Sequence, residues 1–213
     1  ARRAVQASGK AVQVAGSLPP LFGSYRPDLF QAERVSELLT PLVNGLAPHV
    51  DLWLAETQSS IAEARAIYAG LPKDGKPFWL SFTLKDEDTD EVPRLRSGEP
   101  VADAAEAAAQ LGVQVLLFNC SQPEVIGAAI DAARATFERL GVAIQIGAYA
   151  NAFPPQPKEA TANDGLDPLR DDLDPPGYLQ WAADWQARGA SHLGGCCGIG
   201  PEHIAVLAQR LTG

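Results

Sequence analysis

Val115-Leu116-Leu117-Phe118-Asn119-Cys120 is an apolar run that ends in an amide side chain and a cysteine. Such a run has the length and composition of a buried strand, which we place at 113–118. Ser121 and Glu124 then show capping-box spacing, with Pro123 in the first turn, so a helix is expected from there to Gly141. A strand followed directly by a helix is half of a βαβ unit, and this stretch therefore predicts an α/β fold with a parallel sheet.

The same alternation repeats along the chain. Helical stretches, among them 29–47 with a kink at Pro41 and a helix opened by Ser60 and Glu63, separate six strand-like runs at 11–15, 50–55, 78–83, 113–118, 142–146 and 191–193. Chemically distinctive residues stand where these runs end, namely Gly16-Ser17, Glu56-Thr57, Ser81 and Thr83, Asn119-Cys120, Tyr149 and Asn151, and Cys196-Cys197. In a (β/α)8 barrel such ends meet on one catalytic face, whereas a doubly wound sheet usually shows a Gly-rich phosphate loop, which this sequence lacks. The predicted fold is a (β/α)8 TIM barrel that forms one domain over 1–213.

The composition and net charge of the chain limit the classes of molecule that it is expected to bind. The chain of 213 residues is 46% hydrophobic, enough for a real core, and it carries a net charge of -9. An acidic protein argues against nucleic acid or an anionic membrane as its main partner, because both require a basic face. No apolar run approaches the ~20 residues of a membrane span. Few cysteines, and those clustered, suit a reducing compartment, so we expect a cytoplasmic protein.

The three cysteines predict a metal site. Cys196 and Cys197 are adjacent in a Gly-Gly-Cys-Cys-Gly segment, and Cys120 ends an earlier strand. Three thiolates brought together would hold a zinc ion and leave its fourth position open for chemistry. Two alternatives stay open: Cys120 is only a small core residue, or Cys196 and Cys197 form a vicinal disulfide that acts as a redox switch. The histidines His49, His192 and His203 are expected to lie outside the site.

Several of these motifs together resemble one family. They are Leu117-Phe118-Asn119-Cys120, the run from Gly189 through Gly194-Gly195-Cys196-Cys197-Gly198 to Pro201, Val14-Ala15-Gly16-Ser17, Glu56-Thr57 and Ser81-Phe82-Thr83. In this order, from about Val12 to Leu207, they resemble the homocysteine S-methyltransferase family. The resemblance implies a zinc-dependent (β/α)8 barrel that passes a methyl group to the sulfur of homocysteine, giving methionine. It leaves the methyl donor open, because the family uses S-methylmethionine, S-adenosylmethionine, betaine and folate-type donors.

The sequence departs from the family pattern at its start. The family barrel opens with a strand ending in Asp-Gly-Gly, and no such element precedes Ala11. The chain also lacks methionine and shows six strand-like runs rather than the eight of the barrel. We therefore expect that the first two βα units are missing, and that the strands ending at Gly16-Ser17 and Cys196-Cys197 border a gap. Either the missing segment or a partner subunit, for instance in a homo-oligomer, is expected to cover it.

The resemblance also suggests how the substrates are held. Glu56 is the expected partner of the homocysteine ammonium group, although it could instead cap the following helix. Ser17, Thr57, Ser81, Thr83 and Asn119 are expected to orient the substrate carboxylate or the metal ligands. The acidic stretch 86–91 is expected to be a solvated loop. Two other functions remain as alternatives: a non-catalytic zinc-thiolate binding or regulatory barrel, and a vicinal-dithiol redox protein.

Overall fold

The computed structural model describes residues 1–86, 92–155 and 168–211. Its centre is a parallel sheet of six strands in the order β1-β2-β3-β4-β5-β6, with each strand hydrogen-bonded to the next one along the chain. The strands are β1 Ala15–Leu18, β2 Leu52–Gln58, β3 Phe78–Phe82, β4 Val115–Asn119, β5 Gln145–Tyr149 and β6 His192–Leu193. The α/β class and the parallel sheet predicted from the sequence are confirmed.

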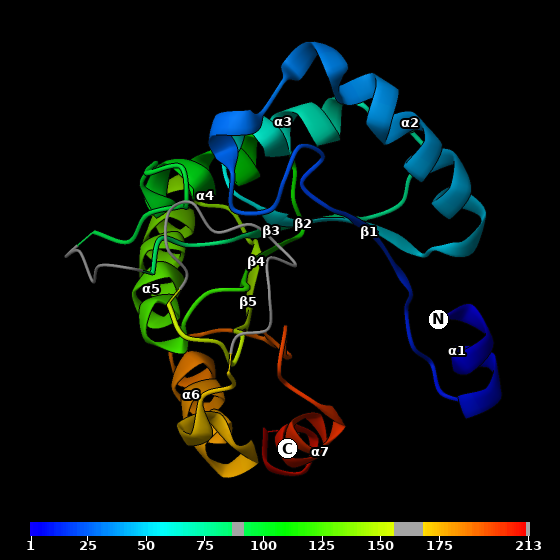
Figure 1. The fold of residues 1–213 in the computed structure, drawn as a ribbon. Helices are drawn as coiled ribbons and strands as arrows, with labels where there is room; N and C mark the ends of the chain where they lie inside the picture. Colours follow the sequence, from blue (N-terminus) through cyan, green and yellow to red (C-terminus); the bar gives the residue numbers. More distant parts are fainter. Residues whose placement is uncertain (87–91, 156–167, 212–213) are drawn as a thin grey trace.

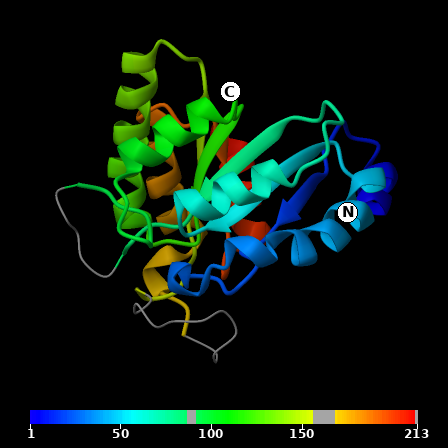
Figure 2. The ribbon, with the colours of Figure 1, turned by 90° about the horizontal axis from the view of Figure 1, so that it is seen from above.

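Helices connect the strands and surround them in an arc (Figure 1). They are α1 Arg2–Ser8, α2 Val35–Leu46, α3 Ile61–Ala69, α4 Val101–Gln110, α5 Pro123–Leu140, α6 Pro175–Ala187 and α7 Pro201–Leu211, with 3-10 turns η1 Pro27–Leu29, η2 Ala32–Arg34, η3 Ala47–His49 and η4 Asp171–Leu173. The view from above shows α1 at the N-terminal edge of the molecule, away from α5 and α6 (Figure 2). Within the described ranges, no helix is long and apolar enough to cross a membrane.

The sheet has two faces of different character, because side chains alternate along a strand. Residues of the outer face belong to the main core together with the helices, among them Leu80, Phe82, Leu116 and Phe118. Residues of the inner face form a second cluster of Leu52, Leu54, Val115 and Leu117, flanked by Trp79 and Tyr149. The inner face is therefore apolar in its middle, and its polar residues are left to the carboxyl ends of the strands.

The described strands form an open sheet with β1 and β6 at its edges. These are the strands predicted to border a gap, and within the described residues they do not pair with each other. Closure into a barrel is therefore not seen in this part of the chain. The carboxyl ends of the strands nevertheless meet on one side, as the barrel prediction requires.

Local signals explain most element boundaries. The Ser60–Glu63 capping box is present, and Gly141 ends α5 at a φ of 68°. The capping box predicted at Ser121 and Glu124 is wrong: α5 has Gln122 at its N-cap without a side-chain bond. Ser121 is used elsewhere, since its hydroxyl accepts from the Leu84 N–H at 2.8 Å and donates to the Asn119 carbonyl at 3.0 Å.

Three predicted segments begin later than expected. The strand predicted at 11–15 starts at Ala15, and the one predicted at 142–146 starts at Gln145. The reason for the second shift is that the Val142 N–H bonds back to the Phe137 carbonyl at 3.1 Å, which makes Val142 part of the helix end. The helix predicted at 29–47 is α2, which starts at Val35 after two 3-10 turns and includes Pro41.

The acidic loop is a second correction. Asp86 was predicted to be solvated, but its side chain is 0% exposed and lies 3.1 Å from Arg96, whose side chain is 3% exposed. Asp86 also accepts a hydrogen bond from the Gln122 N–H at 3.2 Å. The rest of the stretch, 87–91, lies outside the described residues. The buried ion pair thus joins two parts of the segment between β3 and α4, and the hydrogen bond from Gln122 to Asp86 connects that segment to the turn after β4.

Removing one partner of this pair should cost much of the stability, because it leaves the other charge buried. We expect Asp86→Asn to lower the free energy of unfolding by about 3–5 kcal/mol, measured by urea denaturation. Glu138→Gln is the control: it breaks an exposed pair with Arg134 and should cost less than about 1 kcal/mol. Equal small effects in both variants would contradict the buried ion pair.

Candidate active site

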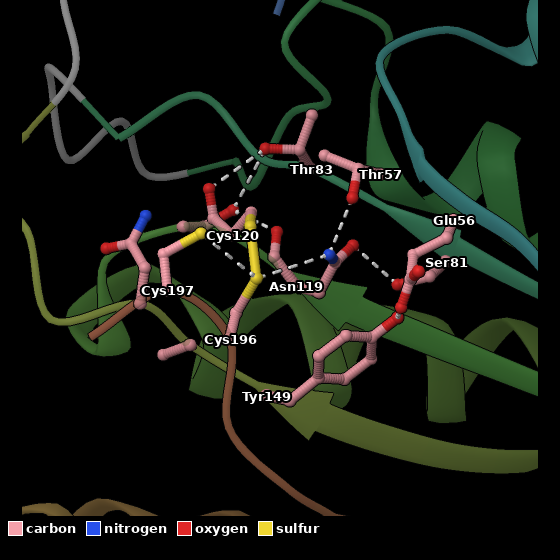
Figure 3. Close-up of a disulfide and its surroundings, with 12 residues drawn as sticks. Glu56, Thr57, Ser81, Thr83, Asn119, Cys120, Tyr149, Cys196 and Cys197 are labelled. Carbon is pink, nitrogen blue, oxygen red and sulfur yellow. Dashed lines mark hydrogen bonds between the residues drawn. A yellow bond between two sulfur atoms is a disulfide. The ribbon is translucent and has the colours of Figure 1, made fainter. Parts of the chain in front are cut away.

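A ring of polar side chains lies at the carboxyl ends of the strands. Ser17, Glu56, Ser81, Asn119 and Tyr149 each hold the last or nearly the last inward position of β1 to β5. Inward residues of neighbouring parallel strands come together at one end of the sheet. Hydrogen bonds join Glu56 to Ser17 and to Tyr149, and another joins Ser81 to Asn119. Figure 3 shows Glu56 beside Tyr149, and Ser81 beside Asn119. Four predicted site residues and the strand-end residue Tyr149 therefore lie in one layer.

The three cysteines meet beside this layer. Their sulfur atoms all lie within 4.8 Å of one another, although Cys120 is more than 70 positions before the other two in the chain. Cys120 and Cys196 form a disulfide with a Cα–Cα distance of 5.8 Å, and Cys197 is a free, exposed thiol. The Cys196 and Cys197 sulfurs are 4.0 Å apart. The alternative of a vicinal disulfide does not match this pairing.

Asn119 connects the cysteines to the polar layer. Its Oδ1 accepts a hydrogen bond from the Ser81 hydroxyl at 2.6 Å, and its Nδ2 donates to the Thr57 hydroxyl at 2.8 Å. The same Nδ2 lies 3.9 Å from the Cys196 sulfur. Asn119 is 1% exposed, and the hydrogen bonds to Ser81 and Thr57 fix the orientation of its amide group. Figure 3 shows it between the sulfur atoms and Glu56.

Two residues beside this network have left-handed backbones. Thr57 has a φ of 61° and Cys120 a φ of 49°, values that are uncommon outside glycine and strained for a β-branched residue. Thr57 lies where the register between β2 and β3 shifts. Each follows an inward residue, Glu56 or Asn119, and each also contacts the site. The left-handed turns thus let two consecutive residues face the same side of the sheet.

Glu56 is held by two hydroxyl groups. The Ser17 hydroxyl donates to one carboxylate oxygen at 2.5 Å, and the Tyr149 hydroxyl donates to the other at 3.0 Å. The helix-cap alternative is wrong, because Ser60 caps α3 with its own side chain. Within the described residues, no ion pair is formed between Glu56 and a protein cation. Its charge therefore remains available to a cationic group of a ligand.

Thr83 has a different environment from the other predicted residues. It is 0% exposed, and its hydroxyl donates to the Cys120 carbonyl at 3.2 Å. Of the two roles expected for these side chains, this contact favours support of the Cys120 turn over contact with a substrate. The three histidines lie outside the cysteine cluster, as expected: His192 packs edge-on against Trp79, with ring centroids 4.9 Å apart.

Tyr149 was predicted from the sequence to lie at a strand end, without an assigned role in the site, and Tyr25 was not singled out. Burial first, and the Glu56 carboxylate second, raise the pKa of Tyr149 well above the usual value, so it stays a hydrogen-bond donor. Tyr25 lies in an irregular segment with a φ of 66°, and no sequence pattern predicts the position of such a segment. Burial, followed by the negative charge of Cys197, raises the pKa of Tyr25 to about 12. Arg96 lies over its ring, 5.2 Å from the centroid.

These features define an α/β protein with a cluster of three cysteine sulfurs and a carboxylate that forms no described ion pair, both at the carboxyl ends of parallel strands. The family model for homocysteine S-methyltransferase matches residues 1–211, nearly the whole chain. The chain belongs to the homocysteine S-methyltransferase family. The resemblance of its Gly-Gly-Cys-Cys and Asn-Cys motifs is thereby confirmed.

Individual proteins similar to this chain are also named homocysteine methyltransferases. A protein of Zea mays named homocysteine S-methyltransferase 4 is 26% identical over 169 residues, which is 76% of this chain and 44% of the maize protein. The homocysteine methyltransferase MmuM from Escherichia coli, in its apo form, superposes with a TM-score of 0.70 at 25% identity, covering 97% of this chain and 66% of MmuM. Its metallated form gives 0.69 at 25% identity, covering 98% and 65%. The chain thus spans less than two thirds of the length of these relatives.

The pairing of the sulfurs gives a direct test. Because Cys120 pairs with Cys196, the oxidised protein should show one thiol per chain by thiol titration in denaturant, and three after reduction. Peptide mapping should place the remaining thiol at Cys197. A peptide that links Cys196 to Cys197, or three thiols before reduction, would contradict the structure.

Proposed function

We propose that the protein transfers a methyl group from a cationic or otherwise activated donor to the sulfur of homocysteine, giving methionine. The observation that carries the proposal is the convergence of three cysteine sulfurs within 4.8 Å beside the Glu56 carboxylate layer. Family membership supports the same reaction. A thiol substrate with an ammonium group would find a sulfur-binding end and an anionic end in one site.

The cysteine cluster fits a zinc ion. Thiolates are soft ligands that zinc prefers, and tetrahedral coordination with Zn–S bonds near 2.3 Å places neighbouring sulfurs about 3.8 Å apart. Cys196 and Cys197, at 4.0 Å, already have nearly this spacing. Cys120, Cys196 and Cys197 would hold the ion after reduction of the disulfide. A zinc ion bound there would leave one position open and would favour the thiolate form of a thiol substrate.

The protein's own groups would orient the substrate. Glu56 carries the charge that an ammonium group needs, and the Ser17 and Tyr149 hydroxyls fix both of its oxygens. Asn119, Ser81 and Thr57 hold one another in place between this carboxylate and the sulfurs. They would keep the homocysteine sulfur near the cysteines and its amino-acid end near Glu56.

The chemistry then needs little from the chain besides position. The substrate sulfur attacks the methyl carbon, the bond from that carbon to the donor breaks, and the donor leaves with the electron pair. A thiolate is the reactive form, because a free thiol has a pKa near 8.5 and is mostly protonated at neutral pH. Holding the sulfur and the methyl group in line is worth a large part of the barrier.

A non-catalytic zinc-thiolate protein is the alternative from a different class. It predicts metal binding without methyl transfer when the reduced, zinc-loaded protein receives homocysteine and a panel of donors. Methionine formation with any donor of the panel supports the proposal. Tight zinc and homocysteine binding without product from any of them would favour the alternative.

The metal ligands can be tested one at a time. The reduced protein should bind about one zinc per chain, and Cys197→Ser should lose most of it, because a hydroxyl is a poor ligand compared with a thiolate. Zinc content after gel filtration is the measurement. Ser17→Ala, which changes the polar layer but no sulfur, is the control and should keep its zinc. Undiminished zinc in Cys197→Ser would remove this residue from the ligand set.

The ammonium contact can be tested separately. Glu56→Gln should weaken homocysteine binding by ~1.5–3 kcal/mol, roughly tenfold or more, because a charge-assisted contact is lost while the shape is kept. Its zinc content should be unchanged. Glu202→Gln, an exposed carboxylate at the start of α7, is the matched control. Equal affinity of both variants by calorimetry would return Glu56 to a purely structural role.

A further inference from the structure

The loop of residues 194–200, which carries Cys196 and Cys197, rests on the segment after β5. The Cys196 N–H donates to the Ala150 carbonyl at 2.9 Å, and the Ala152 N–H donates to the Cys197 carbonyl at 2.9 Å. These backbone bonds fix the middle of the loop. The two ends of the loop are fixed by side chains from different helices.

Tyr178, from α6, holds the first end. Its side chain is 0% exposed, and its hydroxyl lies 2.8 Å from the Gly194 carbonyl and 3.4 Å from the Ala150 carbonyl. Burial raises the pKa of this phenol far above its usual value, so the hydroxyl remains a donor. The same Ala150 carbonyl accepts from Cys196. Tyr178 therefore ties the start of the cysteine loop to the end of β5.

His203, from the first turn of α7, holds the second end. Its Nδ1 accepts a hydrogen bond from the Gly200 N–H at 3.1 Å, so this nitrogen carries no proton. The proton is then on Nε2, which donates to the Leu173 carbonyl at 2.9 Å. The rings of Tyr178 and His203 meet edge to face, with centroids 5.9 Å apart. The buried Tyr178 and the half-buried His203 thus form one support for the loop.

We propose that Tyr178 and His203 are positioning residues that hold Cys196 and Cys197 opposite Cys120. The metal part of this inference rests on the proposed function, but the placement of the sulfurs does not. The contacts described for these two side chains are with the backbone of the loop, with the Ala150 and Leu173 carbonyls and with other rings, and none is with a cysteine sulfur, so we expect their effect to pass through the backbone. Helix capping alone does not account for them, because Tyr178 belongs to α6 and His203 reaches Leu173, outside its own helix.

The first test uses metal-free protein. Oxidation by glutathione disulfide converts the Cys120 and Cys196 thiols into a disulfide and releases two molecules of glutathione, so its equilibrium constant reports how well the sulfurs face each other. Tyr178→Phe keeps the ring against Trp185 and removes the hydroxyl only. The equilibrium constant should fall roughly tenfold. Tyr68→Phe is the control, because Tyr68 lies on α3 and its ring packs against Phe78 of β3, and it should leave the constant unchanged.

The second test uses cobalt as a spectroscopic substitute for zinc. The affinity of the reduced protein for cobalt, followed by the absorption of cobalt bound to thiolate, should also fall about tenfold in Tyr178→Phe. His203→Ala should behave similarly, and His203→Gln, whose amide offers an acceptor and a donor, should recover part of the loss. Ala182→Gly weakens α6, the helix that carries Tyr178, without changing a residue that contacts the loop. Its glutathione equilibrium constant and its cobalt affinity should equal those of the wild type.

The outcomes separate the two proposals. Unchanged glutathione and cobalt constants in Tyr178→Phe would overturn the positioning role, and so would equal losses in Ala182→Gly. A wild-type protein that binds no cobalt, with the glutathione shift still present, would remove the metal function and support the positioning role. The inference is supported in full if the glutathione equilibrium constant and the cobalt affinity both fall in Tyr178→Phe and His203→Ala but not in the control variants.

Discussion

The left-handed turn at Cys120 is the constraint on which the site depends. A regular strand would turn Cys120 away from the side faced by Asn119, because consecutive side chains alternate. At a φ of 49° the backbone breaks this alternation, and both residues lie beside Cys196. Such a conformation costs about 1–3 kcal/mol and persists only where the surroundings enforce it. Here the Cys120 N–H bonds to the Tyr149 carbonyl at 3.3 Å, and Thr83 holds the Cys120 carbonyl.

The same device occurs at Glu56 and Thr57. Glu56 faces Tyr149 and Ser17, and the left-handed Thr57 turns its hydroxyl to Asn119. Two strands thus each supply two consecutive residues to one site. The buried pair of Asp86 and Arg96 stabilises the segment that follows the Cys120 turn, because Asp86 accepts a hydrogen bond from the Gln122 N–H. Chemistry at the strand ends is therefore coupled to the packing of the loop after β3.

The arrangement of the three sulfurs in the structure differs from the one that the proposed function requires. In the structure, two of them form a disulfide and the third is a free thiol; in the proposed function, all three are thiolates on one ion. The two arrangements exclude each other, because a sulfur in a disulfide is not a thiolate. For this chain, the reduced state is the one in which the proposed reaction is expected.

The sequence predicted the parallel α/β fold because its strands are short apolar runs that end in distinctive residues. It also grouped the cysteines, since all three follow such runs. It could not predict which neighbours hold them. Asn119 binds Ser81 and Thr57 only because the strands lie in register, and Asp86 is buried only because Arg96 returns beside it. The false capping box at Ser121 arose for the same reason: a local pattern predicted a helix start, while Leu84 took the hydroxyl.

X-ray absorption with selenohomocysteine tests the central claim most directly, because selenium identifies the substrate atom. The reduced, zinc-loaded protein should show three sulfur neighbours around zinc near 2.3 Å and one lighter ligand. On adding selenohomocysteine, the lighter ligand should be replaced by selenium, and the selenium spectrum should show zinc as a neighbour. Selenium without a zinc neighbour, at concentrations that saturate the protein, would contradict the account.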